Sequence, residues 1–161
     1  MIGNLVALSP ERLRSLIDEP DLVEEFLYPE DGDAEPENHL DLDKAWHAIH
    51  FTLNGKAWEG EEPLFLTILG GEEIGEDIGY GPARYLLPNQ VRIVAQALSS
   101  ITSDDFAAKF EPSALAAAEV YPEIWDEGAE ALEYVQSFYN DLRNFYIAAS
   151  ERNDSVLIYL N

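Results

Sequence analysis

The chain has 161 residues, of which 47% are hydrophobic and none is cysteine, and its 32 acidic and nine basic residues give a formal net charge of −23. This length and hydrophobic content predict one globular domain, residues 1–161, that folds without cross-links, and the lack of cysteine excludes disulfides, thiolate catalysis and zinc–cysteine sites. The negative charge disfavours binding to nucleic acid or to an anionic membrane and favours a basic protein partner.

The N-terminal part predicts a strand at residues 2–8 and a helix at Pro10–Asp18, because a serine and a proline stand at the start of that helix. A short helix follows at residues 21–28. No Lys or Arg occurs in residues 18–43. The acidic stretch 29–38, rich in turn-forming residues, predicts a surface loop.

The sequence also predicts where the protein resides and offers two explanations for its acidic surface. The N-terminus has no basic segment followed by a long apolar run, and no apolar run approaches the roughly 20 residues that span a bilayer. We therefore expect a cytoplasmic protein. The acidic surface has two explanations at this stage, either attraction of a cationic partner or adaptation for solubility in a salty cytoplasm.

Residues 41–54 predict an amphipathic helix that ends at Gly55, where a left-handed backbone suits glycine. At 100° per residue, this helix has an apolar face and an adjacent polar stripe. The apolar face consists of Leu42, Trp46, Ile49 and Leu53, and the polar stripe consists of Asp43, His47, His50 and Asn54.

The middle of the chain predicts two extended segments around a glycine-rich loop. The apolar run at residues 63–69 has the length of a buried strand. Residues 70–82 hold half of the ten glycines and predict an irregular loop. A short extended piece follows at residues 84–87.

The remaining chain predicts helices at residues 88–98, 103–110, 112–120 and 127–149, followed by a last strand at residues 156–160. The helix at 127–149 is the longest and carries a sustained apolar stripe. These elements predict an α+β fold, in which a small sheet of about four short strands is covered by helices.

The polar stripe of helix 41–54 is a candidate site. Asp43, His47 and His50 have the i, i+4, i+7 spacing that could present a carboxylate and two imidazoles to one metal ion, although no HExxH pattern accompanies them. Two alternatives stand beside metal binding. Each histidine could simply be hydrogen-bonded at the helix edge, or His50 could act as a general acid or base.

A cleft between helix 41–54 and loop 70–82 is the second candidate site. There His50 would be the acid or base, Trp46 and Tyr80 the walls, and Arg84 the anchor of a small ligand. The loop matches neither a P-loop nor GxGxxG and carries four carboxylates, so a phosphate cradle is disfavoured. No dinucleotide or flavin motif is present, and we expect no cofactor.

The pattern D-x-D-K-x-W-x-x-x-H-F-x-L-x-G, which begins at Asp41, resembles the signature helix of the YfbM-like family of uncharacterised bacterial proteins. The opening MIGNLVALSPERL, the segment LGGEEIGEDIGYGPARYL, the corner at residues 119–122 and the last strand are similar to the same family. The resemblance implies a single α+β domain in a bacterial cytoplasm and brings no established activity. The family pattern includes His50 but not His47, which weakens the two-histidine metal site.

Two functional hypotheses follow. The first is a non-enzymatic cytosolic interaction protein that engages a cationic partner, in the manner of a toxin-neutralising immunity protein, because a charge of −23 occurs without a catalytic motif. The alternative is an enzyme or small-ligand-binding protein that uses the cleft beside His50.

Overall fold

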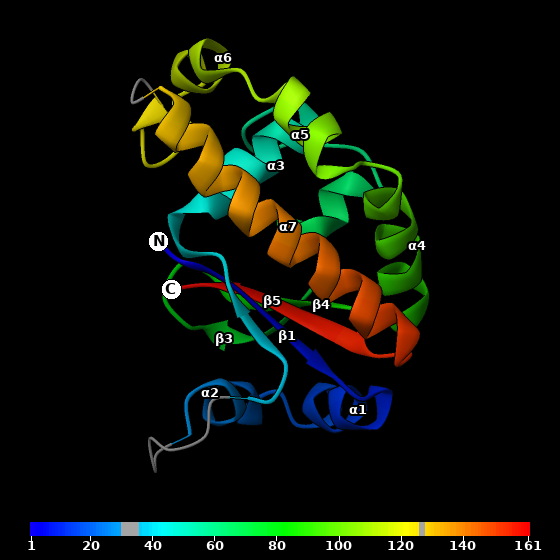
Figure 1. The fold of residues 1–161 in the computed structure, drawn as a ribbon. Helices are drawn as coiled ribbons and strands as arrows, with labels where there is room; N and C mark the ends of the chain where they lie inside the picture. The colour runs from blue at the N-terminus through cyan, green and yellow to red at the C-terminus, as the bar shows by residue number, and fades with distance from the viewer. Residues whose placement is uncertain (30–35, 126–127) are drawn as a thin grey trace.

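The computed structural model describes residues 1–29, 36–125 and 128–161, and it has three layers, with an antiparallel sheet between two groups of helices (Figure 1). Neighbouring strands in the sheet are antiparallel. The strands are β1 (Gly3–Leu8), β2 (His39–Asp41), β3 (Glu72–Asp77), β4 (Pro82–Leu86) and β5 (Ser155–Leu160), and they lie in the order β2-β1-β5-β4-β3.

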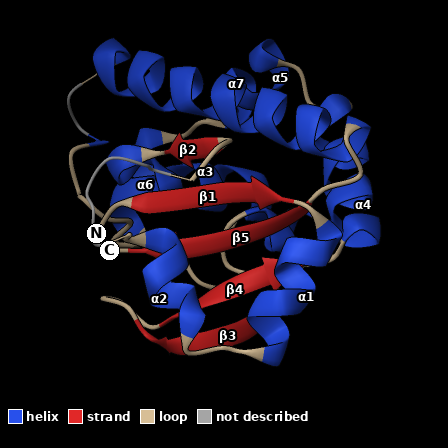
Figure 2. Ribbon diagram, turned by 90° about the horizontal axis from the view of Figure 1, so that it is seen from below, coloured by secondary structure: helices blue, strands red, loops and turns tan. Residues whose placement is uncertain are grey.

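The helices cover both faces of this sheet. Helices α1 and α2 lie on one face, and the long α7 crosses the other face together with α3, α4 and α5 (Figures 1 and 2). The α-helices of the described residues are α1 (Pro10–Asp18), α2 (Leu22–Leu27), α3 (Trp46–Asn54), α4 (Pro88–Ser99), α5 (Ser103–Lys109), α6 (Pro112–Ala117) and α7 (Ala129–Glu151), and two 3-10 turns are η1 (Asp43–Ala45) and η2 (Leu64–Thr67). The predicted single α+β domain, with a long C-terminal helix followed by a final strand, is confirmed.

The two central strands divide the core into two clusters. Leu5 of β1 and Ile158 of β5 pack with α3, α4 and α7, whereas Val6 and Leu157 pack with α1 and α2. Successive side chains of a strand point to opposite faces. Both strands are therefore buried on both sides, which explains why their sequences are continuous apolar runs rather than alternating ones.

The prediction of about four strands was wrong in number and partly in place, since the sheet has five. Residues 63–69 do not form a strand; the 3-10 turn η2 lies there, and Leu66 and Ile68 enter the main core. A short apolar run has the same pattern in a buried strand and in a buried turn of helix. The three-residue strand β2 lay in the segment where no strand was expected.

The prediction of an irregular loop at residues 70–82 was also wrong, because β3 and the start of β4 lie there. Strand β3 is an edge strand in which Ile74 is buried while Glu72, Glu73, Glu76 and Asp77 are exposed. Acidic residues and glycine are depleted in strands generally, but an edge strand tolerates charge on its solvent side.

Helix 41–54 is shorter than predicted. Asp41 belongs to β2, and the 3-10 turn η1 precedes α3, which ends at Asn54. The Asp41 Oδ1 accepts the backbone N–H of Asp43 at 2.6 Å, and Asp43 has a φ of 47°, so the chain turns between strand and helix here. The predicted left-handed end at Gly55 is confirmed, with a φ of 72°.

Candidate functional site

His47 lies on α3 with its ring fully buried and with a hydrogen-bond partner at each ring nitrogen. Its Nε2–H donates to the Ala57 carbonyl oxygen at 2.7 Å, and its Nδ1 accepts the backbone N–H of Tyr121 at 3.0 Å. The ring stacks on Trp46 with a centroid distance of 4.7 Å and contacts Trp58 at 4.3 Å. Burial lowers the pKa of His47, so the neutral ring is the favoured form.

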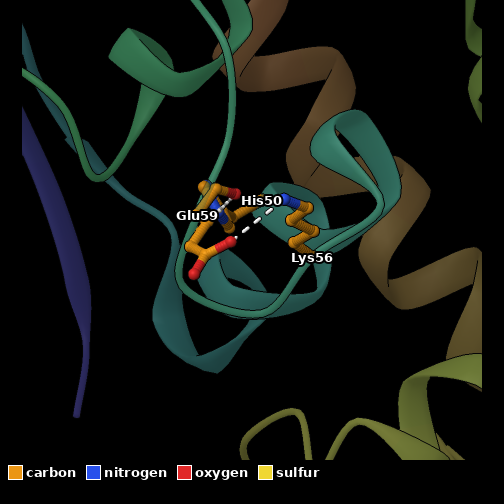
Figure 3. Close-up of polar contacts among 3 residues, drawn as sticks. All are labelled: His50, Lys56 and Glu59. Atoms are coloured by element: carbon orange, nitrogen blue, oxygen red, sulfur yellow. Dashed lines mark hydrogen bonds and ion pairs between the residues drawn. The ribbon is translucent and has the colours of Figure 1, made fainter.

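His50 is also fully buried, one turn further along α3. Its Nε2–H donates to the backbone oxygen of Glu59 at 3.1 Å, while its Nδ1 lies 3.4 Å from the Asn54 amide nitrogen. Burial lowers the pKa of His50 to about 4, and the Glu59 carbonyl opposes that effect only in part. Figure 3 shows the Glu59 backbone turned to His50 and the Glu59 carboxylate turned toward Lys56. The Glu59 Oε2 lies 3.0 Å from the Lys56 Nζ.

The three candidate metal ligands have separate partners. The Asp43 Oδ2 accepts the hydroxyl of Tyr134, on α7, at 2.9 Å, whereas His47 and His50 bind the carbonyls of Ala57 and Glu59. Among the residues that the structure describes, no group of three or more His, Cys, Asp or Glu side chains is placed to hold a metal ion. The two imidazoles hold the segment that follows α3 against that helix.

The other predicted site residues are spread over the fold. Trp46 is fully buried, with its indole N–H 3.4 Å from the Met1 carbonyl oxygen. Tyr80 is 58% exposed and lies in the turn between β3 and β4, while Arg84 of β4 pairs with Glu73 at 3.5 Å. None of these contacts joins Tyr80 or Arg84 to Trp46 or His50.

A hollow of about 270 Å³ opens beside the segment that follows α3. Asn54, Lys56 and Glu61 contribute to its lining, and His50 does not. Asn54 also donates to the His50 backbone oxygen at 3.0 Å. The His50 ring contacts Asn54 through Nδ1 but does not reach the hollow, and the described lining contains no histidine that could act as the predicted acid or base.

Carboxylates gather instead between α2 and β3. Helix α2 approaches β3 closely at Gly75, where an added Cβ would lie 3.1 Å from the Val23 side chain. Two adjoining hollows, of about 320 and 480 Å³, share Asp21 and Glu24. We call them together the acidic groove, which is lined by Pro20, Asp21, Glu24, Glu25, Tyr28, Glu76 and Ile78.

The acidic groove has four carboxylates and no Lys or Arg in its described lining. Arg12 of α1 contacts α2 through the ring of Phe26, at 5.1 Å from its centroid, and is not part of that lining. Closely spaced like charges beside a low-dielectric wall produce a strong local potential. This arrangement attracts a cation and repels a phosphate.

The sequence reasoning missed this groove, although one signal was present. The absence of Lys and Arg from residues 18–43 includes all of α2. Glu76 comes from β3, more than 50 residues later in the chain, and its approach to α2 depends on the sheet pairing of β3 with β4. That pairing was not predicted.

The fold defines a class of single-domain α+β proteins with an antiparallel five-stranded sheet. Residues 1–159 match the family described as domain of unknown function DUF1877, and the protein belongs to that family. Together with the solved structure described next, this match confirms the resemblance to YfbM-like proteins. No curated protein matches the chain significantly.

A solved structure shows the same fold. It is the crystal structure of a protein of unknown function, YfbM from Escherichia coli, with 21% sequence identity, a TM-score of 0.74 and 98% coverage of each chain. At this level of identity the likeness concerns the fold alone. No helix in the described part of this protein is long and apolar enough to cross a membrane.

Proposed function

We propose that this protein is a non-enzymatic cytosolic interaction protein that binds a cationic partner in the acidic groove, in the manner of a toxin-neutralising immunity protein. The observation that carries the proposal is the convergence of Asp21, Glu24, Glu25 and Glu76 without a basic side chain in the described lining. These carboxylates repel one another in the free protein. A basic partner relieves that repulsion on binding and is also steered to the groove before contact.

The histidines support this proposal rather than the enzymatic alternative. His47 and His50 use their Nε2–H groups to hold backbone carbonyls, and burial keeps both rings neutral. A general acid or base must reach a substrate proton within hydrogen-bond distance. In the folded arrangement His50 reaches Glu59 and Asn54 instead.

The test compares two variants with equal changes in charge. The groove variant is Glu24→Gln/Glu25→Gln/Glu76→Gln, and the control variant is Glu130→Gln/Glu133→Gln/Asp141→Asn on the exposed side of α7. Each variant removes three negative charges. Proteins captured by the wild type at low salt are identified. The affinity of each captured protein for the wild type, the groove variant and the control variant is then measured by calorimetry.

We expect a basic partner whose affinity falls about tenfold or more in the groove variant and much less in the control variant. Its binding should weaken as salt rises. Equal losses in both variants would show that net charge alone is responsible and would contradict the groove. Recovery of no basic partner would contradict the proposal as a whole.

A further inference from the structure

A further hollow, of about 200 Å³, lies next to the acidic groove on the same face of the sheet. Strands β1 and β2 place its polar side chains, because Asn4 is opposite Asp41 in the register and directly paired residues share a face. We call this hollow the Tyr28 pocket, and its polar and aromatic lining consists of Asn4, Tyr28, His39, Asp41, Tyr159 and Asn161.

Hydrogen bonds hold this lining in place. Asn4 as a whole is only 4% exposed, and its Nδ2 donates to the Ile2 carbonyl at 3.3 Å and to the Asn161 Oδ1 at 3.1 Å. The Asn4 Oδ1 must then be the acceptor toward the His39 Nε2, 2.8 Å away. The Asn161 Nδ2 donates to the Tyr28 hydroxyl at 2.9 Å. A lining held in this way loses little conformational entropy when a ligand binds.

The chemistry of the pocket suits a cation. Asp41 supplies a carboxylate, and the described lining contains no Lys or Arg. The rings of Tyr28 and Tyr159 meet edge to face at 6.0 Å, and Tyr28 is 41% exposed. A carboxylate beside an accessible aromatic ring binds cations both by charge and by the cation–π interaction.

The size of the pocket limits the ligand. Pockets for small molecules of drug size are usually about 300–1,000 Å³, and about 200 Å³ is less than that. One long side chain fills such a space better than a nucleotide would. Among cationic side chains, arginine has the planar group that stacks on an aromatic ring while also donating to a carboxylate.

Tyr28 connects the two hollows, because it lines both the Tyr28 pocket and the acidic groove. We infer that the Tyr28 pocket is a specificity site that receives one arginine side chain of the basic partner, with the guanidinium paired to Asp41 and stacked on Tyr28. This inference rests on the proposed function, since the groove brings the partner's basic segment to the mouth of the pocket.

The probe is N-acetyl-L-arginine amide, titrated into the protein while the NMR signals of Tyr28, His39 and Asp41 are followed. The neutral analogue N-acetyl-L-citrulline amide has nearly the same shape, and N-acetyl-L-lysine amide tests for any ammonium group. We expect saturable shifts confined to the pocket, with the arginine compound binding about tenfold more tightly than the citrulline compound. Equal binding of the lysine compound would overturn the assignment to arginine.

Asp41→Asn is the test variant, because asparagine keeps the Oδ1 that accepts the Asp43 N–H and thus preserves the turn. Asp104→Asn, at an exposed position on α5, is the matched control. We expect Asp41→Asn to lower the affinity for N-acetyl-L-arginine amide about five- to tenfold and Asp104→Asn to leave that affinity unchanged. Tyr28→Leu should weaken it as well, by removal of the stacking ring.

Different experimental results would contradict the proposed function and the pocket inference. The groove variant should lose the partner and still bind arginine amide in the pocket. If arginine amide does not bind, or binds Asp41→Asn equally well, the pocket inference is overturned while the groove can still hold a basic partner. If arginine amide binds as expected but no basic partner exists, the proposed function fails and the pocket remains a site for a small guanidinium ligand.

Discussion

The backbone N–H of Tyr121 donates a hydrogen bond to the Nδ1 of His47 at 3.0 Å, across 74 positions of the chain. Because Nδ1 accepts this bond, the ring proton is at Nε2, where it donates to the Ala57 carbonyl. One imidazole therefore joins α3 to the segment after it and to the corner that precedes α7. His47, a candidate metal ligand in the sequence, thus uses both ring nitrogens to hold the backbone of separate segments together.

Replacing His47 by leucine should lower the free energy of unfolding by about 2–4 kcal/mol, because the partly buried Tyr121 N–H and Ala57 carbonyl lose their hydrogen-bond partner. Urea denaturation measures the change. Lys56→Ala is the local control, since the exposed Lys56–Glu59 ion pair contributes about 0.5 kcal/mol or less. Similar effects of the two substitutions would contradict the structural role of His47.

The stability contributed by neutral His50 should depend on pH. Burial lowers the pKa of His50 to about 4 from 6.5, so between these values the unfolded chain binds a proton that the folded protein does not. The contribution is complete above about pH 6.5 and is lost as the pH falls toward about 4, with a total of at most about 3 kcal/mol.

His50→Gln isolates this effect, because glutamine keeps a donor for the Glu59 carbonyl and does not titrate. The difference in free energy of unfolding between wild type and variant should shrink as the pH is lowered from about 7 to about 4.5. The same carboxylates are present in the wild type and the variant, so their contribution to the pH dependence of stability cancels in this difference. A difference that is constant with pH would show that His50 is not held neutral.

Gly3→Ala should destabilise the fold through a steric clash, since a Cβ at Gly3 would lie 2.5 Å from the Cβ of Trp46. Neither atom can move without the backbone, so we expect a loss of about 3 kcal/mol and an altered near-ultraviolet circular dichroism spectrum. Gly81→Ala is the comparison, because Gly81 has a φ of 98° and open space around it. Its cost of about 1–2 kcal/mol should come from backbone strain alone and leave the spectrum unchanged.

The groove carboxylates should destabilise the free protein at low salt. The variant Glu24→Gln/Glu25→Gln/Glu76→Gln removes repulsion within the acidic groove, whereas Glu130→Gln/Glu133→Gln/Asp141→Asn removes the same charge from α7. At about 0.02 M salt, the increase in melting temperature over the wild type should be larger for the groove variant than for the α7 variant. This increase should vanish near 1 M salt, where charges are screened within about 3 Å. Equal gains would favour general adaptation to salt over a dedicated groove.

Local sequence signals determined most of the helices. The range Pro10–Asp18 was predicted as observed, because the Ser9 hydroxyl accepts the Arg12 N–H at 3.1 Å and proline occupies the first helical position. The end of α3 at Gly55 followed from the same kind of local chemistry. These signals need only a few neighbouring residues, so they are readable without the fold. The long apolar stripe of α7 is of this kind too.

Strand assignment depended on partners distant in sequence. Residues 72–77 include four carboxylates and a glycine, yet they form β3 because β4 supplies the hydrogen bonds and the charged side chains remain in solvent. The apolar run at 63–69 instead contains the 3-10 turn η2, from which Leu66 and Ile68 enter the main core without pairing in the sheet. Hydrophobic pattern indicates burial, whereas pairing decides between a strand and a turn of helix.

The sequence by itself determined the family, the α+β class, the helix caps at Ser9 and Gly55 and the absence of basic residues from 18–43. Only the tertiary structure decided that His47 and His50 hold backbone carbonyls and that Glu76 joins the carboxylates of α2 beside the Tyr28 pocket. Composition and caps are properties of neighbouring residues. A site arises where the packing of separate elements brings side chains together, and here the pairing of β3 with β4 and of β1 with β2 places them.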